Sequence, residues 1–311
     1  MIEIVARSEP MREAIRLADR VAATDANVLI TGESGAGKDA LALYIHSKSG
    51  RAQQSFVKID CATLPSGLLE SELFGYERGA FTGANDAKPG RLEAAHLGTL
   101  VLDEIAYLSI DSQAKLLRVI ETKEFERLGG RKKVTVDARL LALTNVDLGD
   151  AVNRQSFRED LYYRLNVMQI AVPALRERSK DLPELARAFV VTYGAKHGRE
   201  ANDISQEALA LLAEYEFPGN VRELANTIER AVIISSGKQL GVADLPEPIR
   251  AAVLVERRRM QPQTLAEVEA DYVQQILAAA KGNKTEAARI LGISRKNLYE
   301  KLARMNRKDE G

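Results

Sequence analysis

The pattern of apolar positions divides the 311-residue chain into an α/β part and a helical part. In residues 8–23 apolar side chains recur three or four positions apart, which is typical of an amphipathic helix. From there to Pro173, short apolar runs alternate with stretches of helical pattern. The expected strands are Val28–Ile30, Phe56–Ile59, Leu100–Leu102, Leu140–Leu143 and Val167–Val172. Strands that alternate with helices predict a parallel sheet covered on both faces.

Beyond Pro173 the strand pattern ends, and residues 181–197, 205–215 and 221–236 favour helices. Asn220–Glu223 is expected to be a capping box, because it follows the Pro218-Gly219 breaker. A connector and three more helices follow. The expected parts are an α/β domain at 1–172, a helical lid at 173–240, a linker at 241–262 and a small helical domain at 263–311.

The start signals of these last three helices are side-chain caps and a tight turn. Thr264–Glu267 and Asn283–Glu286 are predicted capping boxes. Gly292-Ile293 is expected to form a tight turn, and Ser294 to cap the last helix. The pattern therefore predicts three short helices at the end of the chain, the last of them at Ser294–Met305.

A glycine-rich segment lies between the first expected strand and the following helix. It has the spacing G-x-x-x-x-G-K and consists of Gly32, Glu33, Ser34, Gly35, Ala36, Gly37, Lys38 and Asp39. Strand, glycine turn, lysine and helix together are typical of a phosphate-binding loop. The glycines let backbone N–H groups approach anionic oxygens, and the helix contributes its positive N-terminal end. Asp39 stands where a generic loop of this kind has the Ser or Thr hydroxyl that contacts magnesium.

Polar residues follow two of the other buried strands. Asp103 and Glu104 end the run at Thr99–Leu102, and Thr144-Asn145 ends the next strand. The carboxyl ends of parallel strands line the ligand crevice. Asp103 is then placed to hold Mg²⁺, Glu104 to activate water, and Asn145 to bond a phosphate or the water. By themselves the two acids also fit an acidic helix start, and Asn145 a simple turn.

Three arginines are candidates for contact with phosphate. Arg158 and Arg164 lie in a helical segment, and a neighbouring subunit can supply such an arginine to the γ-phosphate. Arg222 begins a helix of the lid and can reach the same phosphates. Taken alone, these residues fit solvated helices with surface ion pairs equally well.

Composition excludes several other kinds of site. Lys and Arg equal Asp and Glu at 44 each, so any preference for nucleic acid requires a local basic patch. The single cysteine, Cys61, excludes an intramolecular disulfide and fits a reducing cytoplasm. The three histidines are scattered and lack the spacing of a zinc site. No apolar run approaches membrane-spanning length.

Residues 72–84 carry one aromatic side chain, Phe81, between Gly79 and Gly83. An aromatic in a glycine-flanked loop suggests a mobile partner contact, although a hairpin with Phe81 in the core fits the same pattern. The string G-A-F-T-G-A resembles the signature loop of bacterial enhancer-binding proteins, AAA+ ATPases that activate RNA polymerase carrying sigma-54. In that family the loop contacts sigma-54. Its residues here are Gly79, Ala80, Phe81, Thr82, Gly83 and Ala84.

The resemblance extends from about Ser8 to Leu302. It implies that Lys38 binds phosphate, Asp103 holds Mg²⁺ and Glu104 is the catalytic carboxylate. It further implies that Asn145 is the first sensor and Arg222 the second sensor of the nucleotide. Arg164 and, secondarily, Arg158 match the arginines that act on a neighbour's nucleotide in a ring. The matching segments are Gly32–Asp39, Glu70–Ala84, Gly98–Glu104, Phe125–Gly130, Thr144-Asn145, Phe157–Leu165, Leu175–Arg178 and Pro218–Glu223.

The chain departs from the family pattern at two positions. The family often has Asn at the position of Asp60, bonded to the catalytic glutamate as a switch, and an ionised Asp60 cannot donate that bond. Phe217 replaces a common Trp and is expected to preserve apolar packing. Family members also usually carry a sensory domain before the ATPase. Only about thirty residues precede the loop here, so the signal is expected from a segment outside this sequence or from another protein.

The C-terminal sixty residues resemble the Fis-type helix-turn-helix of these activators. Residues 281–311 contain nine Lys or Arg and four Asp or Glu, a net charge of +5 that supplies the local basic patch. Leu298 and Leu302 are expected to face inward with Ile290 and Leu291, which fixes the rotation of the last helix. The residues then expected to contact DNA are Arg289, Ser294, Arg295, Lys296, Asn297 and Lys301.

The sequence therefore predicts an ATP-hydrolysing transcriptional activator that binds enhancer DNA and sigma-54 polymerase. A ring oligomer, the hexamer of the family, is expected from the resemblance. One alternative is a DNA-binding regulator of the same descent that has lost sigma-54, which an eroded Gly79–Ala84 loop would favour; the loop is intact. A second is an AAA+ unfoldase or helicase loader, against which the helix-turn-helix argues.

Overall fold

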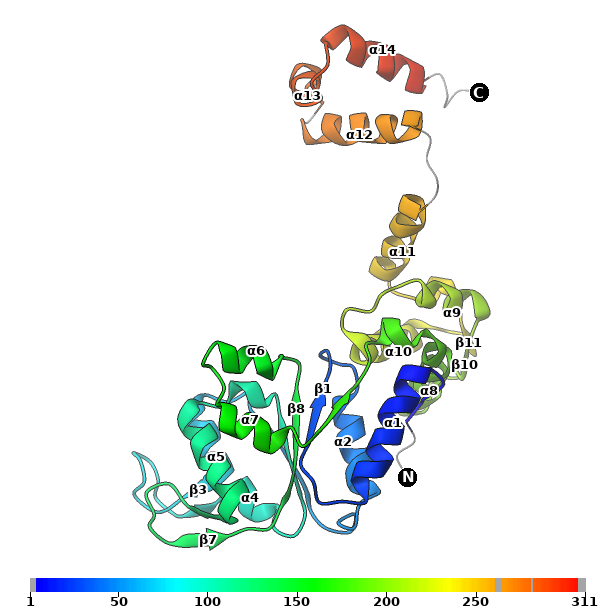
Figure 1. The fold of residues 1–311 in the computed structure, drawn as a ribbon. Coiled ribbons are helices and arrows are strands. Elements are labelled where there is room, and N and C mark those ends of the chain that lie inside the picture. Colours follow the sequence, from blue (N-terminus) through cyan, green and yellow to red (C-terminus); the bar gives the residue numbers. More distant parts are fainter. Residues whose placement is uncertain (1–3, 261–264, 281, 307–311) are drawn as a thin grey trace. The chain divides into compact units, whose positions relative to one another are not determined.

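A five-stranded parallel sheet forms the centre of the N-terminal part (Figure 1). The computed structural model describes residues 4–260, 265–280 and 282–306. In order across the sheet the strands are β2 (Phe56–Asp60), β5 (Thr99–Asp103), β8 (Arg139–Thr144), β1 (Val28–Thr31) and β9 (Met168–Ala171). All four pairings are parallel, as the alternating pattern predicts.

Apolar residues alternate between the two faces of this sheet because successive strand side chains point to opposite sides. In β1, Val28 and Ile30 pack against α1 (Glu9–Ala22) and α2 (Lys38–Ser47). Leu29 lies in the core on the other face. That face is covered by α3 (Ser66–Phe74), α4 (Arg91–Ala94), α5 (Ile110–Thr122), α6 (Leu148–Asn153) and α7 (Glu159–Leu165). Figure 1 shows α1 and α2 on one side of the sheet and α4 to α7 on the other.

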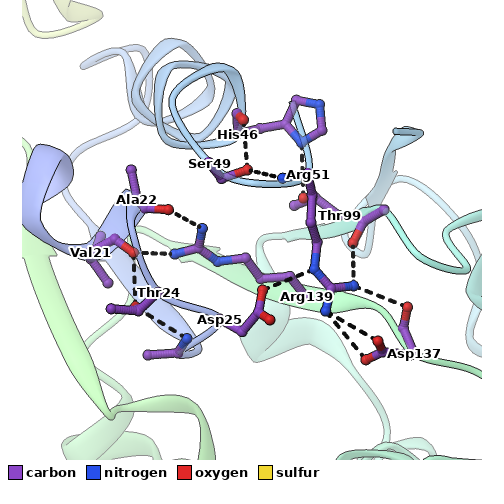
Figure 2. A network of polar contacts seen from close by, with 12 residues as sticks. Val21, Ala22, Thr24, Asp25, His46, Ser49, Arg51, Thr99, Asp137 and Arg139 are labelled. Atoms are coloured by element: carbon purple, nitrogen blue, oxygen red, sulfur yellow. Dashed lines mark hydrogen bonds and ion pairs between the residues drawn. The ribbon is translucent and has the colours of Figure 1, made fainter. Parts of the chain in front are cut away.

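A network of charged residues lies at the amino ends of the strands (Figure 2). Arg139, which is 2% exposed, donates to the carbonyl of Val21 at 2.8 Å and of Ala22 at 3.4 Å, so it satisfies the last turn of α1. The Arg51 guanidinium forms ion pairs with the carboxylates of Asp25, at 2.9 Å, and Asp137, at 3.2 Å. The network links α1 to the start of β8, at the end of the sheet opposite the polar carboxyl ends of the strands. It therefore contributes to the stability of the fold.

Two short hairpins lie beside the sheet; a hairpin around Phe81 was one of the alternatives, whereas the other was not anticipated from the sequence. β3 (Gly75–Tyr76) pairs with β4 (Lys88–Pro89), and β6 (Glu124–Glu126) pairs with β7 (Lys133–Thr135). Backbone hydrogen bonds between Leu128 and both Gly75 and Glu77 join the two hairpins. The loop that contains Phe81 therefore grows from a base fixed by a second loop.

The lid contains the predicted helices α8 (Leu182–His197), α9 (Gln206–Ala213) and α10 (Asn220–Ile234). A 3₁₀ helix with a kink at Arg178, η2 (Leu175–Asp181), precedes them, and a short 3₁₀ helix, η3 (Val242–Asp244), follows them. The expectation that strands end at Pro173 was wrong in detail, because β10 (Asp203–Ile204) pairs with β11 (Gln239–Leu240). Phe217 is 1% exposed, so it packs in the core as expected.

The predicted capping box at Asn220–Glu223 is also wrong. Gly219 is the N-cap of α10, and the Glu223 carboxylate accepts its N–H at 2.8 Å. Asn220 has φ +54° and its side chain leaves the helix to bond other segments. A side chain used in this way cannot also cap its own helix.

Residues 251–311 form a second compact unit, which begins within α11 (Glu247–Met260). Its helices are α12 (Leu265–Ala279), α13 (Lys284–Ile290) and α14 (Arg295–Asn306). The predicted cap at Thr264 lies outside the described residues. Asn283 caps α13, and the Ser294 hydroxyl accepts the N–H of Asn297 at 3.2 Å. Both caps were predicted.

The core of this unit contains Val273, Ala287, Ala288 and Leu298, with Leu291 and Leu302 packed against them. The predicted inward orientation of Ile290 was wrong, since that side chain is 47% exposed. Among the described residues, no helix combines the length and apolar character needed to cross a membrane.

Candidate nucleotide-binding site

The glycine-rich loop wraps the N-terminus of α2. Gly35 and Gly37 have φ of +74° and +109°, a region that glycine enters without steric cost. The Lys38 side chain is nearly buried, and its ammonium donates to the carbonyls of Gly32 at 2.8 Å and Glu33 at 3.3 Å. Lys38 is thus held above the loop, where the helix N-terminus presents unpaired N–H groups toward an anion.

The lid closes directly on this loop. Glu33 accepts hydrogen bonds from Arg176 at 2.8 Å and from the side chain of Asn220 at 3.0 Å. These two bonds hold the pKa of Glu33 at about 2, with that to Arg176 the larger cause. A Cβ on Gly35 would lie 2.4 Å from the Gly219 carbonyl oxygen. The loop therefore requires glycine at this position for contact with the lid as well as for its φ.

Asn220 and Arg178 complete the junction between lid and loop. The Asn220 amide also donates to the Ser34 carbonyl at 3.1 Å, while its oxygen accepts the Leu175 N–H at 2.8 Å. Arg178 is 3% exposed and donates to the Ala36 carbonyl. Sequence reasoning assigned these residues no part in the site. Their contacts with the loop join segments more than 140 residues apart.

The predicted acidic residues lie at the carboxyl end of β5. Asp103 pairs with Lys58 of β2 at 2.7 Å, and the same ammonium pairs with Asp39. Burial by itself lowers the pKa of Lys58, but the bonds to Asp103 and Asp39 outweigh it, so the pKa is raised. Lys58 was missed from the sequence, where it is one more charge in an apolar run.

Glu104 adopts a left-handed conformation with φ +52°, which is uncommon for a residue other than glycine and frequent at functional sites. Its carboxylate accepts the backbone N–H of Asn145 at 3.1 Å and lies 3.5 Å from the Lys38 ammonium. Asp60 instead accepts the N–H of Ala62 at 2.9 Å. In this structure the backbone of the expected sensor, rather than Asp60, holds the glutamate.

A single pocket brings most of the predicted residues together. Arg222 lies at its rim and donates to the Ser34 hydroxyl at 3.0 Å. The lining residues are Ser34, Gly35, Gly37, Lys38, Asp39, Asp60, Ala62, Asp103, Glu104, Val221, Arg222 and Ala225. The nearby thiol of Cys61 is buried, which raises its pKa to about 12, so it stays protonated.

Arg158 and Arg164 do not line this pocket. Arg164 is 60% exposed and lies 3.3 Å from Glu121, and Arg158 pairs with Asp160 at 2.7 Å. The Arg158 N–H donates to the buried Gln113 side chain at 2.8 Å, which fixes the start of α7. The chain thus presents both arginines on its surface, away from its own phosphate-binding loop.

The loop Gly79–Ala84 exposes its aromatic residue, as the partner-contact interpretation requires. Phe81 is 46% exposed and meets Tyr76 edge-on, with ring centroids 4.9 Å apart. The Gly79 N–H donates to the Ala84 carbonyl at 2.9 Å, which closes the loop at its base. The alternative in which Phe81 is tucked into the core is wrong.

In the C-terminal unit, the residues expected to contact DNA occupy the first turn of α14 and its surroundings. Ser294, Arg295, Lys296 and Asn297 are all exposed. Arg289 pairs with Glu286 at 2.6 Å, and Lys301 pairs with Glu269 of α12 at 2.5 Å. The first turn therefore presents two cationic side chains and an amide to solvent.

The parallel sheet, the phosphate-binding loop, the acidic end of β5 and the helical lid define an AAA+ ATPase. Comparison with protein families is more specific. Residues 4–171 match the family described as the Sigma-54 interaction domain, residues 176–261 an AAA+ ATPase lid domain, and residues 264–305 the bacterial regulatory proteins of the Fis family. The chain belongs to the sigma-54-dependent transcriptional activators, which combine an AAA+ ATPase with a DNA-binding helix-turn-helix.

Similar proteins cover almost all of this chain. The transcriptional regulatory protein FlbD of Caulobacter vibrioides is 45% identical over 315 residues, which span 96% of this chain and 69% of FlbD. The regulatory protein AtoC of Escherichia coli is 43% identical over 308 residues, or 96% of this chain and 67% of AtoC. The crystal structure of NtrX from Brucella abortus in complex with ATP has a TM-score of 0.73 at 35% identity, over 97% of this chain and 68% of NtrX.

Proposed function

We propose that this protein binds enhancer DNA, assembles into a ring and uses ATP hydrolysis to convert the sigma-54 polymerase closed complex into an open complex. One observation carries the proposal. The nucleotide pocket and the exposed Phe81 loop are separate features of one folded unit, so hydrolysis and partner contact can be coupled through the fold. Partners of this kind place the protein in the cytoplasm.

In the proposed site, the loop Gly32–Asp39 binds the phosphates through its N–H groups and Lys38. Glu104 accepts the proton of the attacking water, and the Asn145 N–H keeps its carboxylate oriented. The Asn145 side chain senses the γ-phosphate. Arg222, which already bonds Ser34, contacts the phosphates and so links nucleotide binding to the position of the lid. The crystal structure of NtrX in complex with ATP supports ATP as the nucleotide.

The donor set is also suited to Mg²⁺. Asp103 and Asp39 both face the Lys58 ammonium, so this position accepts a cation. In the parts of the chain that the structure describes, no three His, Cys, Asp or Glu side chains form a complete metal site. Mg²⁺ needs no such cage, since it is usually held by one or two carboxylates together with phosphate oxygens and water. When bound, it would neutralise charge that develops on the phosphates.

We further propose that Arg164, and secondarily Arg158, act on the nucleotide of a neighbouring subunit. Both lie outside the pocket of their own chain, and Arg164 is largely exposed. An arginine supplied in trans stabilises the charge of the transition state. This arrangement requires an oligomer, and the family's ring, a hexamer, satisfies it.

The proposed sigma-54 contact is the loop Gly79–Ala84, with Phe81 as its apolar anchor and Thr82 beside it. Aromatic side chains are frequent anchors at interfaces because they bury a large area at low conformational cost. The half-exposed ring of Phe81 has area left to bury.

For DNA, we propose that α14 is the recognition helix. Arg295 and Lys296 are suited to guanine or phosphate, and Asn297 to adenine. Arg289, on the preceding helix, is better placed for backbone phosphate, with Ser294 and Lys301 as further contacts. The helix is short, so the domain is expected to act as a dimer on an inverted repeat, with half-sites one helical turn, about 34 Å, apart.

The DNA proposal is tested by salt titrations of Arg295→Ala and Arg289→Ala on specific and scrambled duplexes. Loss of the base-reading side chain should cost about 1–3 kcal/mol on the specific duplex and little on the scrambled one. Loss of Arg289 should weaken both alike and flatten the salt dependence. Equal losses on both duplexes by both variants would mean that α14 reads no bases.

The whole proposal is tested by open-complex formation at a supercoiled sigma-54 promoter that carries an upstream binding site. The protein with ATP should make the promoter start site single-stranded, as detected by permanganate. A non-hydrolysable ATP analogue and the Glu104→Gln protein should both fail. Opening with the analogue would show that hydrolysis does not drive the step.

A further inference from the structure

Lys58 lies where the structure concentrates negative charge. It is the central residue of β2, and β2 pairs with β5 so that Asp60 lies beside Asp103. Lys58 is two residues from Asp60 and therefore points to the same face of the sheet. Its side chain extends along that face to Asp103 at 2.7 Å and to Asp39 in the first turn of α2.

The environment of the pair makes it more than a surface contact. The Asp103 side chain is only 15% exposed, so its carboxylate is largely shielded from water, whereas Lys58, at 36% exposed, reaches it from the solvent side. Lys38 is engaged separately by the carbonyls of Gly32 and Glu33. Lys58 is therefore the cation that neutralises Asp103 and Asp39 in this structure.

Lys58 contributes one of the few positive charges that offset the carboxylates of the site. Four carboxylates meet three cationic groups here, namely Asp39, Asp60, Asp103 and Glu104 against Lys38, Lys58 and Arg222. The formal balance is −1, and removal of Lys58 makes it −2. A divalent cation would then bind more strongly, and a nucleotide without metal more weakly.

We infer that Lys58 is an internal counter-cation that competes with the divalent metal for Asp103 and Asp39. Lys58 keeps the two carboxylates in position before nucleotide arrives and must release them when the metal–nucleotide complex binds. It thereby sets the metal concentration at which the site fills. The inference rests on the proposed function in one respect, since it takes Asp103 as the metal-binding carboxylate.

The experiment measures binding rather than turnover. A fluorescent ADP derivative, mant-ADP, is titrated into the full chain in EDTA and at a series of Mg²⁺ concentrations, with Lys58→Met and Lys58→Gln as neutral variants. Both should lower the Mg²⁺ concentration at half-maximal binding by about 5- to 150-fold, the usual range of coupling between two sites. Both should also bind mant-ADP more weakly than wild type in EDTA.

Two controls separate this effect from general loss of charge. Lys58→Arg keeps the cation and should restore a Mg²⁺ midpoint close to that of wild type. Lys133 is another strand lysine with a carboxylate partner, Glu124 at 2.9 Å, and does not line the pocket. Lys133→Met should leave the midpoint unchanged.

An unchanged midpoint in both neutral variants would overturn the inference while leaving the proposed metal site intact. Equal weakening of mant-ADP binding in EDTA and in Mg²⁺ would overturn it as well, because Lys58 would then contact phosphate directly. If wild type itself binds mant-ADP without any response to Mg²⁺, the proposed metal role of Asp103 fails, and the inference fails with it.

Discussion

Phe81→Ala separates the ATPase from the partner contact. Phe81 is 46% exposed, so folding buries only about half of its ring. Complete burial of a phenylalanine contributes about 1.5–3 kcal/mol, so the half-buried ring contributes about 1 kcal/mol. Its edge-on contact with Tyr76 adds about 0.5–1.5 kcal/mol. The free energy of unfolding should therefore fall by about 1.5–2.5 kcal/mol, well below the 5–15 kcal/mol of a typical domain.

At this cost the variant remains folded, and its ATPase activity should stay within about twofold of wild type because the ring is outside the nucleotide pocket. Binding to purified sigma-54 should be lost. Phe125→Ala is the contrasting control, since Phe125 is 4% exposed and its removal should cost about 3–5 kcal/mol. The assays are urea unfolding, phosphate release and sigma-54 binding by fluorescence anisotropy. Joint loss of ATPase activity and fold in Phe81→Ala, or retained sigma-54 binding, would refute the reasoning.

Three further variants test the site, the assembly and the fold. Glu104→Gln should bind ATP normally and lose turnover, because the amide cannot accept the proton; normal phosphate release would remove Glu104 from the catalytic role. Arg164→Ala mixed with Lys38→Ala should recover part of the ATPase activity that each lacks alone, since one kind of mixed interface is intact, and an inactive mixture contradicts a role in trans. Arg139→Met should lower the free energy of unfolding by about 1–3 kcal/mol, because the carbonyl of Ala22 loses the guanidinium as donor, whereas that of Val21 keeps the Thr24 hydroxyl. A loss below about 0.5 kcal/mol, the scale of a surface substitution, would show that the network in Figure 2 contributes little.

The central sheet and the phosphate-binding loop were predictable because their signals are local. Each strand of the sheet contains a short, mainly apolar run, and the glycine spacing before Lys38 fixes a turn between strand and helix. Ser294 and Asn283 were predictable as caps for the same reason, since a cap bonds to N–H groups two or three residues away.

What the sequence did not reveal depends on contacts between distant segments. The pairing of Lys58 with Asp103 requires β2 to lie next to β5, and strand order is not encoded in either strand. Asn220 is a residue type that often caps helices, but its side chain bonds Glu33 and Leu175 instead, at sequence separations of 187 and 45 residues. Ile290 follows the apolar spacing of its helix, yet this three-helix unit is too small to cover that position.

The central claim is that ATP-dependent changes at the pocket control the contact of the Phe81 loop with sigma-54. It is tested most directly by the binding of purified sigma-54 to the wild-type protein with no nucleotide, with ADP, and with an ATP transition-state analogue. The account predicts a stable complex only with the analogue, and none in any state for Lys38→Ala. Equal binding in all three states, or no binding in any, would contradict it.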